Sequence, residues 1–205
     1  MTNIATAPAP YEAVLKYWFG HVEETIVPSE HRARVWFGED KEIDAGIKTR
    51  FSGLLDEAIE GRLADWESSP HGQLAMIILL DQFARHIFRG IPKAFDQDDK
   101  ALSICLKGMR HEADHSLSLI ERVFYYFPLL HSEKMGYQEQ SVRAYRALVD
   151  LAFSETRVIF DSFLKFANHH YSVIQRFGRF PQRNIALGRE STKEEIDYLK
   201  EIGEH

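Results

Sequence analysis

The chain has 205 residues, of which 44% are hydrophobic and 27% charged, and its formal net charge is −6 at pH 7. This is the composition of an ordinary globular protein, and the chain is long enough to fold without disulfides or a structural metal. The acidic balance excludes the strongly basic footprint of most nucleic-acid-binding proteins, so we expect no nucleic-acid partner. The single cysteine, Cys105, excludes a disulfide framework, and its apolar neighbours in A-L-S-I-C-L indicate a packed thiol.

No segment of the sequence has the character of a membrane span or an export signal. The longest apolar runs, L-A-M-I-I-L-L and V-F-Y-Y-F-P-L-L, are far shorter than the roughly 20 residues that cross a bilayer. The first ten residues lack a basic segment followed by an apolar one. We therefore expect a cytoplasmic protein with no membrane partner, in which residues 1–10 form a flexible arm and residues 11–205 a single domain.

Apolar residues recur at helical rather than strand spacing along the chain. A stripe from Ile43 to Ile59 predicts a helix that Gly61 can end. Residues 71–88, which follow Pro70, are apolar on most sides, so this helix is expected at the centre of the fold.

The second half of the chain continues the helical pattern. Asp96 or Asp98 can cap a helix that runs to Met109, and further helices are expected at 118–134, 137–152, 155–177 and 192–202. Because no alternating strand pattern and no Gly-, Pro- or Ser-rich linker is present, we predict one all-α domain of about eight antiparallel-paired helices. The chain shows no sharp repeat of the tetratricopeptide period, although successive helix pairs would suit a related solenoid.

The segment H-E-A-D-H, residues 111–115, matches the zinc-protease pattern H-E-x-x-H. In those enzymes both histidines lie one turn apart on a single helix. Here Gly108 comes just before a very polar segment, Ser118 and Glu121 can form the capping box of a following helix, and no third ligand motif follows. We therefore interpret the segment as a connection between two helices, and expect neither a metal site nor a cofactor.

The segment L-L-D-Q-F-A-R-H-I-F-R-G carries polar groups inside an otherwise apolar helix. Asp81 and Arg85 are one turn apart, as are Gln82 and His86. Two interpretations stay open. The polar residues form an intrahelical ion pair on the one solvent-exposed stripe of the helix, or this stripe faces a cleft.

The segment Y-Y-F-P-L-L-H-S-E-K places a proline in an apolar helical run. Pro128 either kinks the helix or starts a new one, and leaves a carbonyl near residue 124 in need of a partner. His131 and Glu133 follow, and a histidine beside a carboxylate serves acid–base chemistry, metal binding or a structural hydrogen bond.

The segment R-F-G-R-F-P-Q-R-N, residues 176–184, is followed by L-G-R and carries a local excess of positive charge. Residues 171–190 contain one acid, Glu190, and four arginines: Arg176, Arg179, Arg183 and Arg189. Gly178 can end the preceding helix, while Phe177 and Phe180 can anchor the loop to the core.

Two roles are open for these arginines. The guanidinium groups and Asn184 can line a pocket that grips carboxylate or phosphate. Alternatively, Asp81 and Glu133 are candidate partners that would close the arginines into a structural network.

Together with Y-W-F-G near the start and S-T-K-E-E-I-D-Y-L near the end, these three segments resemble the bacterial domain-of-unknown-function family 924, in order, from about residue 11 to 200. The resemblance implies an all-helical fold like that of the tetratricopeptide superfamily and implies no known reaction. The sequence departs from the family motifs at Ala84, His86 and Gln182, where Pro, Asn and His are usual. A mechanism with that last histidine as proton carrier is therefore not expected here.

The leading hypothesis is a polar cleft that binds a small anionic molecule or an acidic peptide end. It is formed by Asp81, Gln82, Arg85, His131, Glu133, Arg176, Arg179, Arg183 and Asn184. In one alternative the protein is a hydrolase-type enzyme that uses His131 as acid or base, with Glu133 or Asp81 orienting it. In another it is a tetratricopeptide-like interaction scaffold, for which exposed Trp18, Trp36 and Phe37 would suit an interface.

Overall fold

The computed structural model describes residues 10–20 and 30–203. The expected flexible arm, residues 1–10, lies outside this part of the chain except for Pro10, which begins the first helix. The described residues contain helices and no strand: α1 (Pro10–Phe19), α2 (Glu30–Phe37), α3 (Lys41–Ile59), α4 (Pro70–Ile77), α5 (Ala84–Ile87), α6 (Asp98–Arg110), α7 (Leu119–Tyr125), α8 (Phe127–Leu130), α9 (Met135–Leu151), α10 (Arg157–Phe177) and α11 (Lys193–Glu201). The all-α prediction is confirmed.

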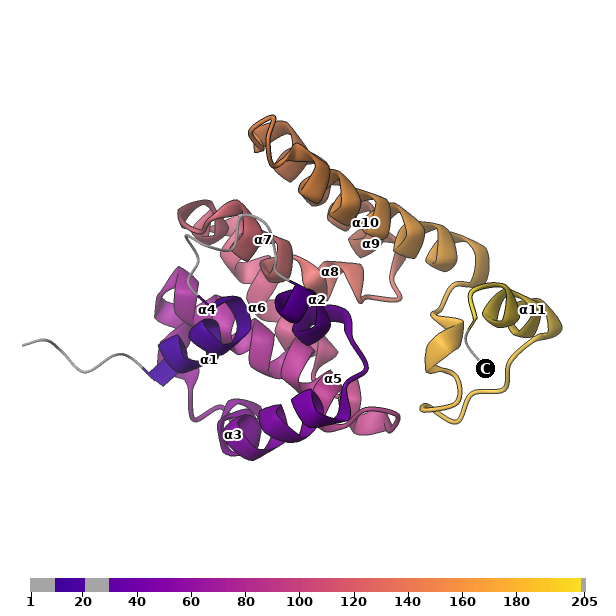
Figure 1. The fold of residues 1–205 in the computed structure, drawn as a ribbon, viewed down its shortest axis with the longest axis horizontal. Helices are drawn as coiled ribbons and strands as arrows, with labels where there is room; N and C mark the ends of the chain where they lie inside the picture. Colours follow the sequence, from indigo (N-terminus) through magenta and orange to yellow (C-terminus); the bar gives the residue numbers. More distant parts are fainter. Residues whose placement is uncertain (1–9, 21–29, 204–205) are drawn as a thin grey trace, which may run out of the picture.

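A buried rod forms the centre of the fold, as the apolar stretch after Pro70 predicts. The rod consists of α4, a π-helical turn (Ile78–Phe83) and α5, joined without a break in helical backbone angles. It starts sharply because the Ser69 hydroxyl accepts from the Gly72 amide and Pro70 occupies the first turn. Helices α1, α3 and α6 pack around it (Figure 1). If α7 and α8 are also taken as one rod, the described residues hold nine helices, close to the number expected.

The start of α6 differs from its prediction. The residue before the helix is Gln97, whose side chain makes no capping hydrogen bond, and Asp98 is already the first helical residue. Neither Asp96 nor Asp98 is therefore the cap. The carboxylate of Asp98 instead accepts hydrogen bonds from two arginines.

The segment 111–115 connects two helices, as predicted. Helix α6 ends at Arg110, Glu112 has the left-handed backbone angle φ 55°, and a short 3₁₀ turn (Ala113–Ser116) follows. The two histidines therefore do not share a helix. The expected capping box between Ser118 and Glu121 is present at the start of α7.

Gly108 lies inside α6 rather than at its end, for a steric reason. A Cβ added there would fall 1.7 Å from the Tyr125 hydroxyl oxygen and 2.5 Å from Gln73 Oε1. The glycine thus allows α6 to approach a hydrogen bond between Tyr125 and Gln73, 2.6 Å long.

Pro128 starts a new helix, one of its two predicted effects. Helix α7 ends at Tyr125 and α8 begins at Phe127, with the proline in its first turn. The Tyr145 hydroxyl donates to the carbonyl of Val123 (2.8 Å), next to the carbonyl expected to need a partner. The break lets the chain turn so that His131, directly after α8, faces the central rod.

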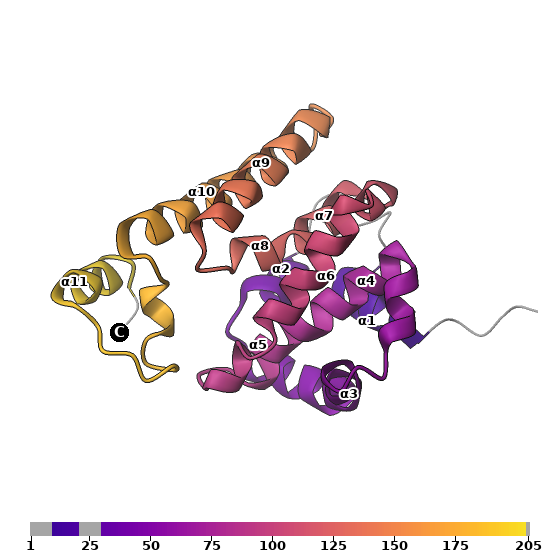
Figure 2. The ribbon, with the colours of Figure 1, turned by 180° about the vertical axis from the view of Figure 1, so that it is seen from behind.

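Helices α9 and α10 form a hairpin that leads away from the other helices to the C-terminal segment, residues 178–203 (Figures 1 and 2). Gly178, in the left-handed conformation at φ 69°, ends α10 as predicted. Beyond it, Phe180 and Tyr198 form a small apolar cluster with Val173 and Ile174 of α10. The predicted tetratricopeptide-like stacking of the helix pairs stays a prediction.

The aromatic residues considered for an interface divide into two kinds. Trp18 and Trp36 are buried in the main core, so they supply no surface for a partner, whereas Phe37 is 52% exposed. No helix in the described part of the chain is both long and apolar enough to span a bilayer. The thiol of Cys105 is buried, and burial raises its pKa well above the usual value, as expected for a packed cysteine.

Candidate functional site

The centre of the candidate site is the π-helical turn in the buried rod. Asp81 and Gln82 lie on this turn, and Asp81 is fully buried. A π-helical turn widens the helix by one residue and often occurs where a helix must present side chains for function. A buried carboxylate is costly unless it is paired, so its partners define the site.

The Asp81 carboxylate has three charged or polar partners. It accepts hydrogen bonds from Gln82 Nε2 at 2.7 Å and from His131 Nδ1, which lies 2.7 and 2.9 Å from its two oxygens, and it forms an ion pair with Arg85 Nη1 at 2.6 Å. Burial alone would raise the pKa of Asp81, but Arg85 and His131 outweigh burial and hold the pKa well below its usual range. The carboxylate is therefore ionised, and the predicted one-turn pair of Asp81 and Arg85 is present.

A second carboxylate links Arg85 to the C-terminal segment. Asp98 accepts two parallel hydrogen bonds from Arg85, 2.8 and 2.9 Å long, and a third from Arg183 at 3.2 Å. Arg183 also donates to the carbonyl of His131 (2.9 Å), and its guanidinium lies over the rings of Phe95 and Phe180. Burial and the charge of Arg85 lower the pKa of Arg183 to about 10, so Arg183 is still a cation at neutral pH.

His131 is held in one orientation and is neutral at pH 7. Burial and the charge of Arg85 lower its pKa and outweigh the opposite effect of Asp81. Because Asp81 is ionised, Nδ1 carries the proton that it donates, and Nε2 is left as an acceptor. No described residue forms a hydrogen bond with Nε2. The ring stacks on Phe127 at 5.3 Å between centroids.

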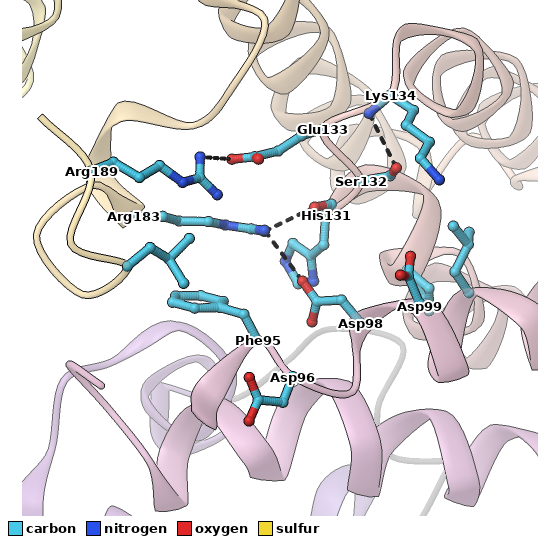
Figure 3. Close-up of a pocket in the computed structure, with 13 residues that line it drawn as sticks. Phe95, Asp96, Asp98, Asp99, His131, Ser132, Glu133, Lys134, Arg183 and Arg189 are labelled. Atoms are coloured by element: carbon cyan, nitrogen blue, oxygen red, sulfur yellow. Dashed lines mark hydrogen bonds and ion pairs between the residues drawn. The ribbon is translucent and has the colours of Figure 1, made fainter. Parts of the chain in front are cut away.

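The larger cavity at the site has a volume of about 340 Å³ and walls of opposite charge (Figure 3). One wall carries two cations of the C-terminal segment, Arg183 and Arg189, whereas Lys134, the residue before α9, lies apart from them beyond Ser132 (Figure 3). Another wall carries acids at and just before the start of α6: Asp96, Asp98 and Asp99. His131 and Glu133 also line the cavity.

A smaller cavity of about 150 Å³ shares His131 with the larger one. It is lined by the predicted Gln82 and Arg85, together with aromatic rings that include Phe127 and Phe166. Both cavities therefore meet at the histidine that Asp81 holds.

Glu133, in the turn after α8, connects this turn to the C-terminal segment by hydrogen bonds. It accepts from Arg189 Nη1 and from the Phe180 amide, both at 2.9 Å. Although burial alone would raise its pKa, these two donors keep the pKa of Glu133 below the ordinary value. This confirms Glu133 as an arginine partner, whereas the arginine that pairs with Asp81 is Arg85 of the same helix.

Three of the predicted site residues lie elsewhere, so the idea of one convergence of all nine is corrected. Arg179 forms two hydrogen bonds to Glu195, 2.6 and 2.8 Å long, and Arg176 pairs with Glu194. Asn184 is buried and donates to Ser191 and Glu195. Helix α11 supplies both glutamates, so these contacts connect α11 to the end of α10 and to the loop before α11, and the three side chains line neither cavity.

Sequence reasoning missed Asp98, Phe95 and His170 as parts of the site. The acidic run D-Q-D-D offered a signal for Asp98, because one helix start does not use three acids as caps. No local pattern pointed to His170, whose ring lies 6.4 Å from that of His131 and whose pKa burial lowers to about 3. Within residues 10–20 and 30–203, no group of three His, Cys, Asp or Glu side chains is arranged to hold a metal ion.

Comparison with known proteins connects this geometry to a family. The family model described as "Bacterial protein of unknown function (DUF924)" matches residues 14–203. The chain belongs to the DUF924 family. Among solved structures, it is similar to the protein of unknown function ATU0120 from Agrobacterium tumefaciens, with 29% identity, a TM-score of 0.77, and coverage of 93% of this chain and 97% of that one. No curated protein matches the sequence.

The departures from the DUF924 motifs leave the centre of the site intact. Gln182 is exposed and lines neither cavity. His86 is buried, with Nδ1 2.7 Å from Asp44, and Arg89 binds the same carboxylate. Ala84 is part of the apolar core. These substitutions change the surroundings of the rod and not the Asp81–His131 pair.

Proposed function

We propose that this DUF924 protein binds a small molecule that carries both an anionic and a cationic group, such as an amino acid or a peptide end, in the 340 Å³ cavity. The observation that carries the proposal is that one cavity has a wall with Arg183 and Arg189 and a wall with Asp96 and Asp99, which meet where Arg183 binds Asp98 (Figure 3). The lining holds four acids and three Lys or Arg side chains, so a ligand with negative charge alone would find no net attraction.

Unused hydrogen-bond donors support an anion at the cationic wall. Arg189 uses one Nη1 donor on Glu133, and Arg183 uses two donors on Asp98 and the His131 carbonyl. A guanidinium has five N–H donors, so several remain on each residue. Lys134 Nζ forms no hydrogen bond with a described residue. These groups suit a carboxylate or a phosphate.

Unpaired acids on the acidic wall support a cationic group. Within the described chain, Asp96 and Asp99 take part in no ion pair, although both line the cavity. An ammonium group placed there would share the cavity with the arginines. The structure therefore favours an amino-acid-like ligand over the plain anion expected from the arginine-rich segment.

Thermal-shift screening of amino acids, dipeptides, dicarboxylates and phosphate esters tests this proposal. We expect amino acids or dipeptides to stabilise the wild type, and Arg189→Gln to weaken that binding by about tenfold, the usual effect of losing one charge-assisted hydrogen bond. Arg176→Gln is the matched control, since it also removes one arginine and one ion pair, but Arg176 lies in the last turn of α10 and lines neither cavity at His131. An equal response of both variants to every compound would contradict the proposal.

A second candidate function, acid–base catalysis of hydrolysis, is favoured by the Asp81–His131 pair. His131 is neutral, its Nδ1 proton is donated to a buried carboxylate, and Nε2 has no partner among the described residues. In a hydrolysis, Nε2 would take a proton from water as the water oxygen bonds to the electrophilic atom of the substrate. His131 would then return that proton to the leaving group.

Hydrolytic activity profiling separates catalysis from binding alone. A catalytic His131 predicts turnover that is lost in His131→Gln and that persists to lower pH than a histidine of ordinary pKa would allow, because the pKa of His131 is lowered. Ligand binding that survives in His131→Gln, with no hydrolysis by the wild type, would leave the binding proposal standing and reject the catalytic one.

A further inference from the structure

A separate cavity of about 440 Å³ lies between α1, α2 and α3. We call it the basic cavity, because its lining includes three cations: Lys16, Arg32 and Arg50. It shares no lining residue with the two cavities at His131.

The charge of this basic cavity is one-sided. No carboxylate is among its described lining residues, although the whole chain has a net charge of −6. The like charges of Lys16 and Arg50, neither of which forms an ion pair with a described residue, repel each other and concentrate a positive potential there. An anion that enters the cavity relieves this repulsion.

The guanidinium of Arg50 is positioned by two aromatic rings, those of Tyr17 and Phe51. Its guanidinium carbon lies 4.8 Å from the ring centroid of Tyr17 and 5.4 Å from that of Phe51. Cation–π contact orients the guanidinium plane while its N–H groups stay available at the edges. Arg50 forms no ion pair with any residue that the structure describes.

The neighbouring side chains shape the same cavity from α1 and α2. Arg32 donates to the backbone carbonyls of Tyr17 and Trp18, which fixes its position at the end of α1. Burial raises the pKa of the Tyr17 hydroxyl despite the nearby charges of Arg50 and Arg32, so it remains a donor at neutral pH. The side-chain ammonium of Lys16 forms no hydrogen bond with a residue in the described part of the chain.

The rest of the lining is largely apolar, which favours an organic ligand over an inorganic ion. Ala13 and Ile43 contribute aliphatic groups beside the cations, whereas Val35 is buried in the core. The volume of about 440 Å³ exceeds the need of an inorganic ion and lies within the roughly 300 to 1,000 Å³ usual for small-molecule sites. We propose that the basic cavity binds a small organic anion, with its phosphate or carboxylate on Lys16 and Arg50 and its apolar part against Ala13 and Ile43.

Titration calorimetry with phenyl phosphate, benzoate, inorganic phosphate and phenol tests this site. We expect saturable one-to-one binding of phenyl phosphate or benzoate. Inorganic phosphate, which lacks the apolar part, should bind at least about tenfold more weakly than phenyl phosphate, and phenol should not bind. The absence of saturable binding of either organic anion at millimolar concentration would overturn the proposal, as would inorganic phosphate binding as tightly as phenyl phosphate.

Charge variants on two helices locate the binding. Lys16→Gln and Arg50→Gln should each weaken the organic anion about tenfold. Lys48→Gln is the matched control, since it removes an exposed cation of α3 that does not line the cavity, and it should change binding less than about twofold. Equal effects of Arg50→Gln and Lys48→Gln would contradict the assignment.

One further variant separates this site from the cavity at His131. Arg183→Gln removes a cation from that cavity alone, so binding at the basic cavity should be unchanged in it. Loss of phenyl phosphate binding in Arg183→Gln, with retention in Arg50→Gln, would place the anion at His131 and overturn the proposal.

Discussion

The helices α1 to α8 and the C-terminal segment are stabilised by different forces. The former enclose an extensive apolar core that includes fully buried Trp18, Phe83 and Phe124. The C-terminal segment contributes only Phe180 and Tyr198 as buried apolar residues to its small cluster. Its other contacts are largely ion pairs, such as Arg179 with Glu195 and Arg189 with Glu133.

This difference matters because the larger cavity has walls from both regions. His131 and Asp98 come from the region of α1 to α8, which we call the body, while Arg183 and Arg189 come from the loop before α11. Apolar burial depends little on pH, whereas ion pairs weaken when a partner is protonated. As the pH falls, the C-terminal segment, which carries the cationic wall, should therefore unfold locally before the region that carries the acidic wall.

The largest effect is expected inside the body. Asp81→Ala removes the carboxylate that pairs with buried Arg85 and His131 and should lower the free energy of unfolding by about 3 to 5 kcal/mol. Urea denaturation followed by circular dichroism measures this. Asp99→Ala, at a cavity-lining acid without an ion pair to a described residue, should change stability by less than about 0.5 kcal/mol. A similar loss in both variants would refute a special role for Asp81.

A smaller and local effect is expected in the C-terminal segment. Phe180→Ala empties the centre of its small cluster, and a buried Phe→Ala change typically costs about 3 kcal/mol or more. Since the body keeps its own core, hydrogen exchange should speed up in residues 178–203 and stay slow in α4. Ile185→Ala, at a side chain 80% exposed in the same segment, should leave exchange unchanged. Faster exchange in α4 as well would show that the two regions unfold together.

Acid should weaken the C-terminal segment selectively. Hydrogen bonds from Arg179, more than any other influence, lower the pKa of Glu195 to about 2, against an unfolded value of about 4.3. The stability that this depressed pKa contributes is complete above the unfolded value and is lost as pH falls toward 2. NMR amide shifts of residues 178–203 should therefore change in this window. Glu195→Gln should flatten that dependence and Glu201→Gln, on the exposed side of α11, should not.

The smallest effect is expected at an exposed ion pair between α10 and the C-terminal segment. Arg176 and Glu194 pair at 2.9 Å, but their side chains are 48% and 62% exposed. Arg176→Gln should change the free energy of unfolding by less than about 0.5 kcal/mol in thermal melts. A loss above about 1 kcal/mol would mean that surface charge contributes more to this segment than its exposure suggests.

Local signals predicted most of the secondary structure. Gly178 ends α10, Pro128 separates α8 from α7, and Ser118 caps α7, because each acts through its own backbone or through residues within one turn. Asp98 was misassigned as a possible cap, since its sequence position suits a helix start while its carboxylate is used by two arginines from distant segments.

The candidate site could be predicted only in part, because its decisive contacts are long-range. Arg179 and Arg183 are four residues apart in one motif, yet one turns to α11 and the other to the cavity. Both residues are arginines of the same short motif, so neither the residue type nor the local spacing distinguishes them. The choice depends on the path of the chain after Gly178, which sequence periodicity does not describe.

The amino-acid sequence by itself determined the all-α class, the positions of most helix ends, the identity of residues 111–115 as a connection and the one-turn pair of Asp81 with Arg85. These features depend on neighbours within a few residues. The tertiary structure alone decided that His131 faces Asp81, 50 residues earlier, and that acids and arginines line one cavity. Charge attraction has no preferred sequence separation, so the packing of the helices selects which partners meet.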